Sequence, residues 1–325
     1  MSVVNPNHVL PRTYEWNAAI EHSIGKADVV TLTYLGAAGR KLMRKDVFIA
    51  PSRNFTGEFD LLSNAGTSSY NALQAQYRHR LSHGLQTLVS YTWAHSIDDV
   101  SSDVNFQNAP LAASPASAER GPSDYDIRQT FSGAVSYDIP GPHNGVWKQA
   151  FGNWSTDSII YARSAPPVNV VTGKNPFGPA SGALAGAASA QRPDVVPGVP
   201  FYLPAPGGPC GRVINAAAFT IPASGQGDLG RNALRGCDAV QLDTTLRRQF
   251  HLNERLALQV RADFFNIFNH PNFGSPINFL SSPQFGKPTQ MLSTSLGSGG
   301  QSGGLSPLYQ IGGPRSIQLA LKLQF

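Results

Sequence analysis

Large apolar side chains recur at alternate positions in the last eleven residues of the chain, with Gln318, Ala320, Lys322 and Gln324 between them. Every second position is apolar, namely Ile317, Leu319, Leu321, Leu323 and Phe325. A period of two is that of a β-strand with one apolar and one polar face. The segment has the roughly 9–11 residues that a tilted strand needs to cross a bilayer, and its final aromatic suits a membrane interface. A half-buried strand of a soluble sheet would show the same pattern, so this segment alone leaves both interpretations open.

The amino-acid composition bears on the choice between a membrane protein and a soluble sheet protein. Only 14% of the 325 residues are charged, against about 25% in ordinary soluble proteins. The net charge of +5 comes from scattered Lys and Arg, and without a basic stripe we expect no nucleic-acid partner. No segment has the ~18 consecutive apolar residues of a membrane helix. The residues after Met1 lack the basic and apolar regions of a signal peptide.

Alternation recurs along the whole chain. For residues 70–81 a helix competes with a strand, but Gln76 and Arg80 are polar where a helix would need apolar residues. We expect an N-terminal loop over residues 1–13. Nine strands follow, at residues 14–24, 28–39, 70–81, 85–94, 126–139, 153–165, 240–252, 256–268 and 315–325.

The connections between these strands alternate in length. Short turns are expected at 25–27, 82–84, 140–146 and 253–255, and long loops at 41–69, 95–125, 166–239 and 269–314. Outer-membrane barrels have short periplasmic turns and long extracellular loops. We therefore predict an all-β, antiparallel transmembrane barrel. Because single-chain bacterial barrels have an even number of strands and an open edge in lipid is costly, nine strands predict an incomplete barrel, part of a larger one.

Five segments carry a resemblance to a known family. They are LALQVRADFFNIFNHPNFG at 256–274, SYTWAHSIDD at 90–99, NAAAF at 215–219, GRNALRG at 230–236 and PRSIQLALK at 314–322. Together they resemble the C-terminal half of the Oar-like TonB-dependent outer-membrane receptors. The resemblance extends from about residue 11 to residue 325.

This resemblance implies a 22-stranded barrel around an N-terminal plug, with import of a bulky ligand driven by the TonB complex. The sequence lacks the family's plug, TonB box, carboxypeptidase-regulatory-like domain and signal sequence. We therefore expect a fragment that carries the last nine strands, with energised import only in the full-length form. Expected partners are outer-membrane lipid and the barrel-assembly machinery, for which the closing alternating strand is the assembly signature. We expect no enzymatic activity and no cofactor.

Polar residues between the apolar positions should face the lumen. The candidates for contact with a ligand or plug are Gln74, Gln76, Arg78, Arg80, Arg247, Arg261 and Asp263. Plain hydration of a polar interior explains them equally well. Cys210 and Cys237 would close a loop of about 28 residues if they were bonded, which would indicate an oxidising compartment.

One acidic cluster follows a predicted strand. It contains His95, Asp98, Asp99 and Asp103. Asp and His at a barrel mouth could activate water, as in an omptin-type protease, or hold calcium loosely. A solvated loop base is the simpler interpretation. A surface barrel that binds or adheres through its long loops remains the main alternative to a receptor. Residues 297–304 are rich in glycine but lack the Lys-Ser/Thr and helix of a phosphate loop, so we expect a mobile loop.

Overall fold

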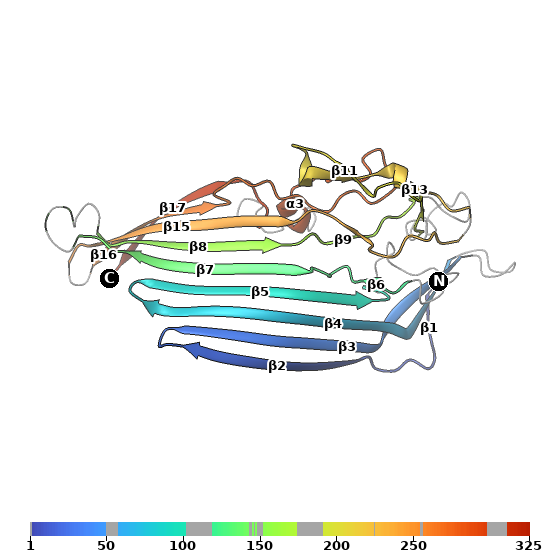
Figure 1. Cartoon of the computed structure of the whole chain (residues 1–325), viewed down its shortest axis with the longest axis horizontal. Coiled ribbons are helices and arrows are strands. Elements are labelled where there is room, and N and C mark those ends of the chain that lie inside the picture. The colour runs from blue at the N-terminus through green and yellow to red at the C-terminus, as the bar shows by residue number, and fades with distance from the viewer. Residues whose placement is uncertain are drawn as a thin grey trace.

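The chain forms one large antiparallel sheet whose strands follow each other in sequence order (Figure 1). The computed structural model describes residues 2–49, 58–101, 119–142, 145, 147, 152–173, 191–223, 225–253, 256–297 and 311–325. The nine main strands are β2 Arg12–Ile24, β3 Asp28–Ile49, β4 Glu58–Ser82, β5 Leu85–Asp98, β7 Gln129–Ile139, β8 Trp154–Arg163, β15 Ala239–His251, β16 Ala257–Phe265 and β17 Ser316–Gln324. The sheet is not closed, because β2 and β17 are its two edges.

The strand registers give the sheet two chemically different faces. Residues directly opposite each other on neighbouring strands share a face. One such row, which we call the apolar row, crosses seven strands and consists of Ile20, Leu32, Ala75, Tyr91, Phe131, Ala162 and Val240. On β17 the apolar positions are 52–77% exposed. An apolar surface of this extent is that of a sheet whose face contacts lipid.

Strands β3 and β4 continue, paired with each other, well beyond the ends of the neighbouring strands. A long loop was expected there, at residues 41–69. The two strands remain paired as far as Ile49 and Glu58. Two register shifts, between Gly39 and Leu42 and between Leu42 and Arg44, interrupt the period of two. The expectation was wrong because a bulge exchanges the faces of the residues that follow it, so the alternation disappears although the strands continue.

The N-terminal segment is also more ordered than expected. Residues 1–13 were predicted as loop, but β1 Ser2–Val4 pairs in parallel with Asp60–Leu62 of β4, and β2 already begins at Arg12. This pairing extends the sheet at the end where the long connections lie, which we call the loop end. The opposite end, with the short connections at 25–27 and 83–84, is the turn end (Figure 1).

The long connections carry short elements of their own. Their described residues between β5 and β7, between β8 and β15 and between β16 and β17 are here called the loop cap. Its elements are β6 Gly121–Pro122, β9 Pro167–Val168, β10 Asp194–Val195, β11 Tyr202–Pro204, η3 Pro209–Gly211, β12 Arg212–Ile214, η4 Ala216–Ala218, β13 Phe219–Thr220, β14 Leu234–Arg235 and α3 Leu292–Gly297. The region 166–239, expected as a plain loop, thus contains three pairs of short strands, β10 with β13, β11 with β12 and β9 with β14.

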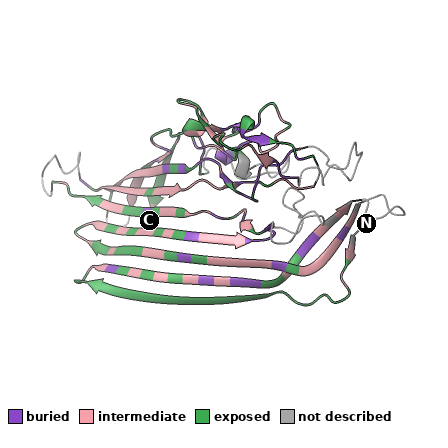
Figure 2. Ribbon diagram, turned by 45° about the vertical axis from the view of Figure 1, so that its right-hand side comes forward, coloured by how far each residue is buried: buried purple, intermediate pink, exposed green. Residues whose placement is uncertain are grey.

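A small hydrophobic core holds the loop cap together. Its buried members are Val168, Val170, Ile214, Ala218, Phe219, Leu229, Leu234 and Phe285. Phe219 stacks on Phe201 and meets Phe285 edge-on, with ring centroids 5.6 and 6.0 Å apart. Buried segments, purple in Figure 2, occur in the loop cap and on the extension of β3 and β4, whereas the edge strand β2 is green along its whole length. Within the described residues, no helix has the length and apolar character needed to span a membrane.

Candidate functional site: the polar face and the loop cap

The polar face of the sheet collects most of the residues predicted to face the lumen. Gln76 lies opposite Ser90, and the same row continues through Ser132 and Tyr161 to Gln241 on β15. Six of the seven predicted residues share this face: Gln74, Gln76, Arg78, Arg247, Arg261 and Asp263. The seventh, Arg80, lies in the register shift between His79 and Ser82, where strand pairing no longer assigns it a face.

The charged groups of this face neutralise one another, both within a strand and across strands. Arg261 Nε donates to both carboxylate oxygens of Asp263, at 2.8 and 2.9 Å. Thr245 Oγ1 donates to the same carboxylate at 2.6 Å. Arg247 Nε lies 3.2 Å from the Asp157 carboxylate. Asp263 is buried by these contacts, whereas the Arg261 side chain stays 50% exposed and open to a further partner.

A hollow of about 670 Å³ opens at the turn end of the sheet. Its polar-face wall is formed by Asp138, Ser155, Arg247, Gln249 and Gln259. These residues lie on neighbouring strands and pair in register, Asp138 with Ser155 and Gln249 with Gln259. The hollow therefore offers hydrogen-bond donors and acceptors of both charge signs to a polar partner.

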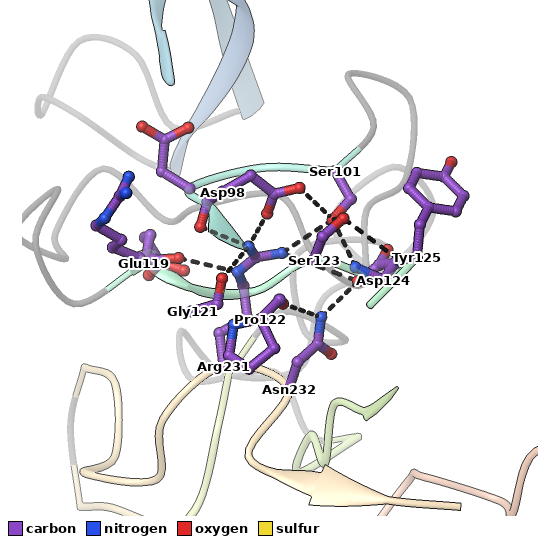
Figure 3. Close-up of polar contacts among 12 residues, drawn as sticks. Asp98, Ser101, Glu119, Gly121, Pro122, Ser123, Asp124, Tyr125, Arg231 and Asn232 are labelled. Carbon is purple, nitrogen blue, oxygen red and sulfur yellow. Dashed lines mark hydrogen bonds and ion pairs between the residues drawn. The ribbon is translucent and has the colours of Figure 1, made fainter. Parts of the chain in front are cut away.

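At the loop end, Arg231 is the centre of a buried polar network (Figure 3). Its side chain is fully buried. It forms an ion pair with the Asp98 carboxylate, and it donates to the backbone carbonyls of Asp98 at 2.8 Å and Glu119 at 2.9 Å. The Asp124 carboxylate lies 3.8 Å away. Because Asp98 ends β5, one arginine fastens the loop cap to a strand of the sheet.

The next residue extends the same network. Asn232 has a φ of 55°, a left-handed conformation that Asn tolerates better than most residues. Its amide nitrogen donates to the Pro122 carbonyl at 2.8 Å and to the Asp124 carboxylate at 2.7 Å. Beside it, Arg192 and Glu119 form a buried ion pair at 2.8 Å. Segments from two different connections are thus joined by charge-assisted hydrogen bonds.

Asp126 forms a second junction, nearer the sheet. Its buried carboxylate accepts hydrogen bonds from Arg235 at 2.6 Å, Arg128 at 2.8 Å and the Ser96 N–H at 2.8 Å, and it lies 3.0 Å from His95 Nδ1. Burial raises the pKa of Asp126, but hydrogen bonds from Arg235, Ser96 and His95 and the charge of Arg235 outweigh it and lower the pKa to about 2. Asp126 therefore stays ionised at any physiological pH.

Cys210 and Cys237 form a disulfide bond, with their Cα atoms 5.3 Å apart. The bond links η3 to the residues just before β15. Tyr202 lies close by: its hydroxyl donates to the Arg235 carbonyl at 3.0 Å and accepts from the Arg235 N–H at 2.7 Å. The cross-link therefore fastens the same part of the loop cap that the Asp126 junction holds.

The structure does not bring the predicted acid–base cluster together. His95 and Asp98 are three residues apart on β5 and so point to opposite faces. Asp98 pairs with Arg231, while Asp99 accepts from Thr67 N–H and Oγ1, both at 2.9 Å. Asp103 and residues 298–304 of the glycine-rich stretch lie outside the described residues. Within the described residues, no group of three or more His, Cys, Asp or Glu could hold a metal ion.

Sequence reasoning missed the residues that organise the loop cap. Arg231 and Asp98 are 133 positions apart, and Arg192 and Glu119 are 73 apart. Local periodicity cannot reveal such pairs. One signal was present, since Arg231, Asn232 and Arg235 all belong to the segment GRNALRG that contributes to the family resemblance.

The chain is similar to a known domain family and to several solved structures. A family model described as "Outer membrane beta barrel domain" matches residues 1–318. The outer membrane transporter YddB from Escherichia coli has a similar fold, with a TM-score of 0.52 at 8% identity, over 99% of this chain and 34% of YddB. BauA, the ferric preacinetobactin receptor from Acinetobacter baumannii, gives 0.45 at 9% identity, over 96% of this chain and 29% of BauA. The ferripyoverdine receptor of Pseudomonas aeruginosa gives 0.42 at 13% identity, over 86% of this chain and 26% of the receptor. No curated protein matches the sequence.

The chain thus spans about a third of the length of YddB. The predicted fold class, an unclosed antiparallel sheet of the outer-membrane barrel type, is confirmed, as is the predicted location. Because the family model covers nearly the whole sequence, the chain belongs to the outer membrane β-barrel domain family, and its place is the outer membrane of a Gram-negative-type bacterium.

Proposed function

We propose that the chain is a sector of the wall of a TonB-dependent outer-membrane receptor that imports a bulky ligand. The observation that carries this proposal is the unclosed sheet of nine main strands with one apolar and one polar face. An exposed strand edge in lipid leaves backbone N–H and C=O groups unsatisfied, at several kcal/mol each. Further strands of a larger barrel would satisfy β2 and β17 and would enclose a lumen wide enough for a plug.

The polar face supplies the contacts that a plug requires. Arg261 is half exposed beside its partner Asp263, and the hollow at the turn end presents Asp138, Arg247 and Gln249. A plug seated in the barrel would bind to this wall, and the TonB complex would act on the plug from the turn end. The loop cap at the opposite end would make the first contact with the ligand.

The sector can be tested by asking whether β2 meets β17. Ala19→Cys and Ala320→Cys place thiols on the polar face of the two edge strands. In a sector of a larger barrel, a bifunctional thiol reagent should not join these two thiols. The positive control is Arg261→Cys with Ala320→Cys, which the reagent should join because the two positions lie directly opposite each other. Efficient cross-linking of the first pair within one chain would mean a closed small barrel and would end the proposal.

A surface barrel that only binds or adheres is the second candidate, because the loop cap is an ordered surface with its own core. The two candidates differ in their need for energy. Import through TonB stops when a protonophore collapses the proton gradient, whereas adhesion continues. Cell-associated ligand that stays at the surface and ignores the protonophore would favour adhesion.

A further inference from the structure

A second hollow lies on the apolar side of the sheet, beneath the loop cap. Its volume is about 540 Å³. Tyr91, Phe131, Ala162 and Val240 line it. They are consecutive members of the apolar row, on the four neighbouring strands β5, β7, β8 and β15. The floor of this hollow is therefore part of the surface that contacts lipid.

The hollow lies at the boundary of the apolar band that is nearer the loop end. The next positions toward the loop end on β7 and beyond β8 are Gln129 and Ser164, which are polar. Val240 and Phe250 are ten positions apart on β15, or about 34 Å along the strand at 3.4 Å per residue. A strand tilted by about 45° converts this length into a height of about 24 Å, which matches the roughly 25 Å apolar band of an outer-membrane barrel. The hollow thus adjoins the lipid headgroups of one leaflet.

Arginines surround the mouth of this hollow. Arg128 and Arg235 both donate to the same oxygen of Asp126, at 2.8 and 2.6 Å, so their guanidinium groups are held side by side. Arg212 stacks on the Tyr202 ring at 4.3 Å and donates to the Gly236 carbonyl at 3.4 Å. Among the described residues, no carboxylate lies within ion-pair distance of Arg212.

The local charge balance is positive. Four arginines line the hollow, namely Arg128, Arg163, Arg212 and Arg235, and the lining contains one carboxylate, that of Asp238. The nearby carboxylate of Asp126 is buried and already shared by Arg128 and Arg235. Guanidinium groups bind phosphate oxygens bidentately, and a fixed pair needs little ordering when the anion arrives. An apolar floor beneath such a pair suits a molecule with a phosphate above and hydrocarbon below.

From this arrangement we propose that the hollow binds a phosphorylated lipid of the outer leaflet, with its headgroup phosphate on Arg128, Arg212 and Arg235 and an acyl chain along the apolar row. The site belongs to the outside of the barrel and does not depend on import. A bound lipid would fasten the loop cap to the membrane surface. Arg235 would contact the phosphate while it also donates to the Asp126 carbonyl at 2.7 Å, within the loop cap.

The test compares diphosphorylated lipid A with enzymatically dephosphorylated lipid A, by native mass spectrometry of the full chain in dodecyl maltoside micelles. Each basic residue near an anionic lipid surface contributes about fivefold in affinity, so the double variant Arg128→Gln/Arg212→Gln should bind lipid A about 25-fold more weakly. It should also lose the preference for the phosphorylated form. Arg120→Gln is the matched control, because Arg120 is an exposed arginine of the loop cap that donates to Thr67 and Ser69, away from the hollow.

Three results would overturn the proposal. The first is equal binding of both lipid forms by the native chain. The second is a phosphate preference that survives in the double variant. The third is binding of inorganic phosphate as tight as that of lipid A, which would identify a free anion as the ligand. If the double variant fails to fold, Arg212→Gln alone decides the question, since among the described residues that side chain stacks on Tyr202, donates to the Gly236 carbonyl and forms no ion pair.

Discussion

Replacing Leu321 by arginine tests which face of the sheet meets the membrane. Leu321 is 74% exposed and lies opposite Val260 on the apolar side. β17 extends from Ser316 to Gln324, so residue 320 is its midpoint and Leu321 is only about 3 Å further along the strand. A charged side chain at this depth costs about 2–4 kcal/mol on the lipid face of a barrel. A cost of 3 kcal/mol corresponds to a folding equilibrium about 150-fold less favourable.

The matched control is Gln318→Arg on the same strand. Gln318 lies opposite Asp263 on the polar side, where a new guanidinium meets water and a carboxylate instead of hydrocarbon. The measurement is a urea titration of folding into phosphatidylcholine vesicles, followed by tryptophan fluorescence, for the native chain and both variants. We expect a large loss of stability for Leu321→Arg and a change below about 1 kcal/mol for the exposed control. Equal losses, or a larger loss for the control, would refute the assignment of the two faces.

Three further predictions concern the loop cap. Arg231→Met should leave the buried Asp98 carboxylate without its ion-pair partner and destabilise the loop cap by about 3–5 kcal/mol, seen as faster proteolysis of the loop cap, whereas the exposed Arg120→Met should change little. The folded pKa of Asp126, about 2, lies below its unfolded value, so its contribution of about 2 kcal/mol is present above about pH 4 and is lost as the pH falls through 2; an acid titration of unfolding should show this slope in the native chain and not in Asp126→Asn. Cys210→Ser with Cys237→Ser should lower the stability of the loop cap by about 3–4 kcal/mol for a loop of about 28 residues, and an unchanged thermal transition of the loop cap would contradict that estimate.

The structure also explains why one prediction failed. Residues 41–69 show no period of two, and a loop was expected there. The paired strands β3 and β4 nevertheless continue through most of this region, and Arg44 and Lys45 are buried against Asp46 and Asp60. Outside the membrane, hydrocarbon no longer selects the residues of one face, and bulges exchange the two faces. A strand pair of this kind leaves no simple pattern in the sequence.

The amino-acid pattern alone was enough to predict the nine main strands and to separate their apolar from their polar positions. Each residue of a membrane strand faces either hydrocarbon or the polar interior. In a segment such as residues 317–323, the polarity of each side chain therefore indicates which of the two it faces. The construction of the loop cap, by contrast, follows from contacts between distant parts of the chain. Arg231 and Asp98, or Asp126 and Arg235, meet across more than a hundred residues of chain, and partners so far apart are set by the path of the whole chain and not by any local pattern. The same holds for the arginines at the mouth of the apolar hollow, because separate segments of the chain bring them to one place.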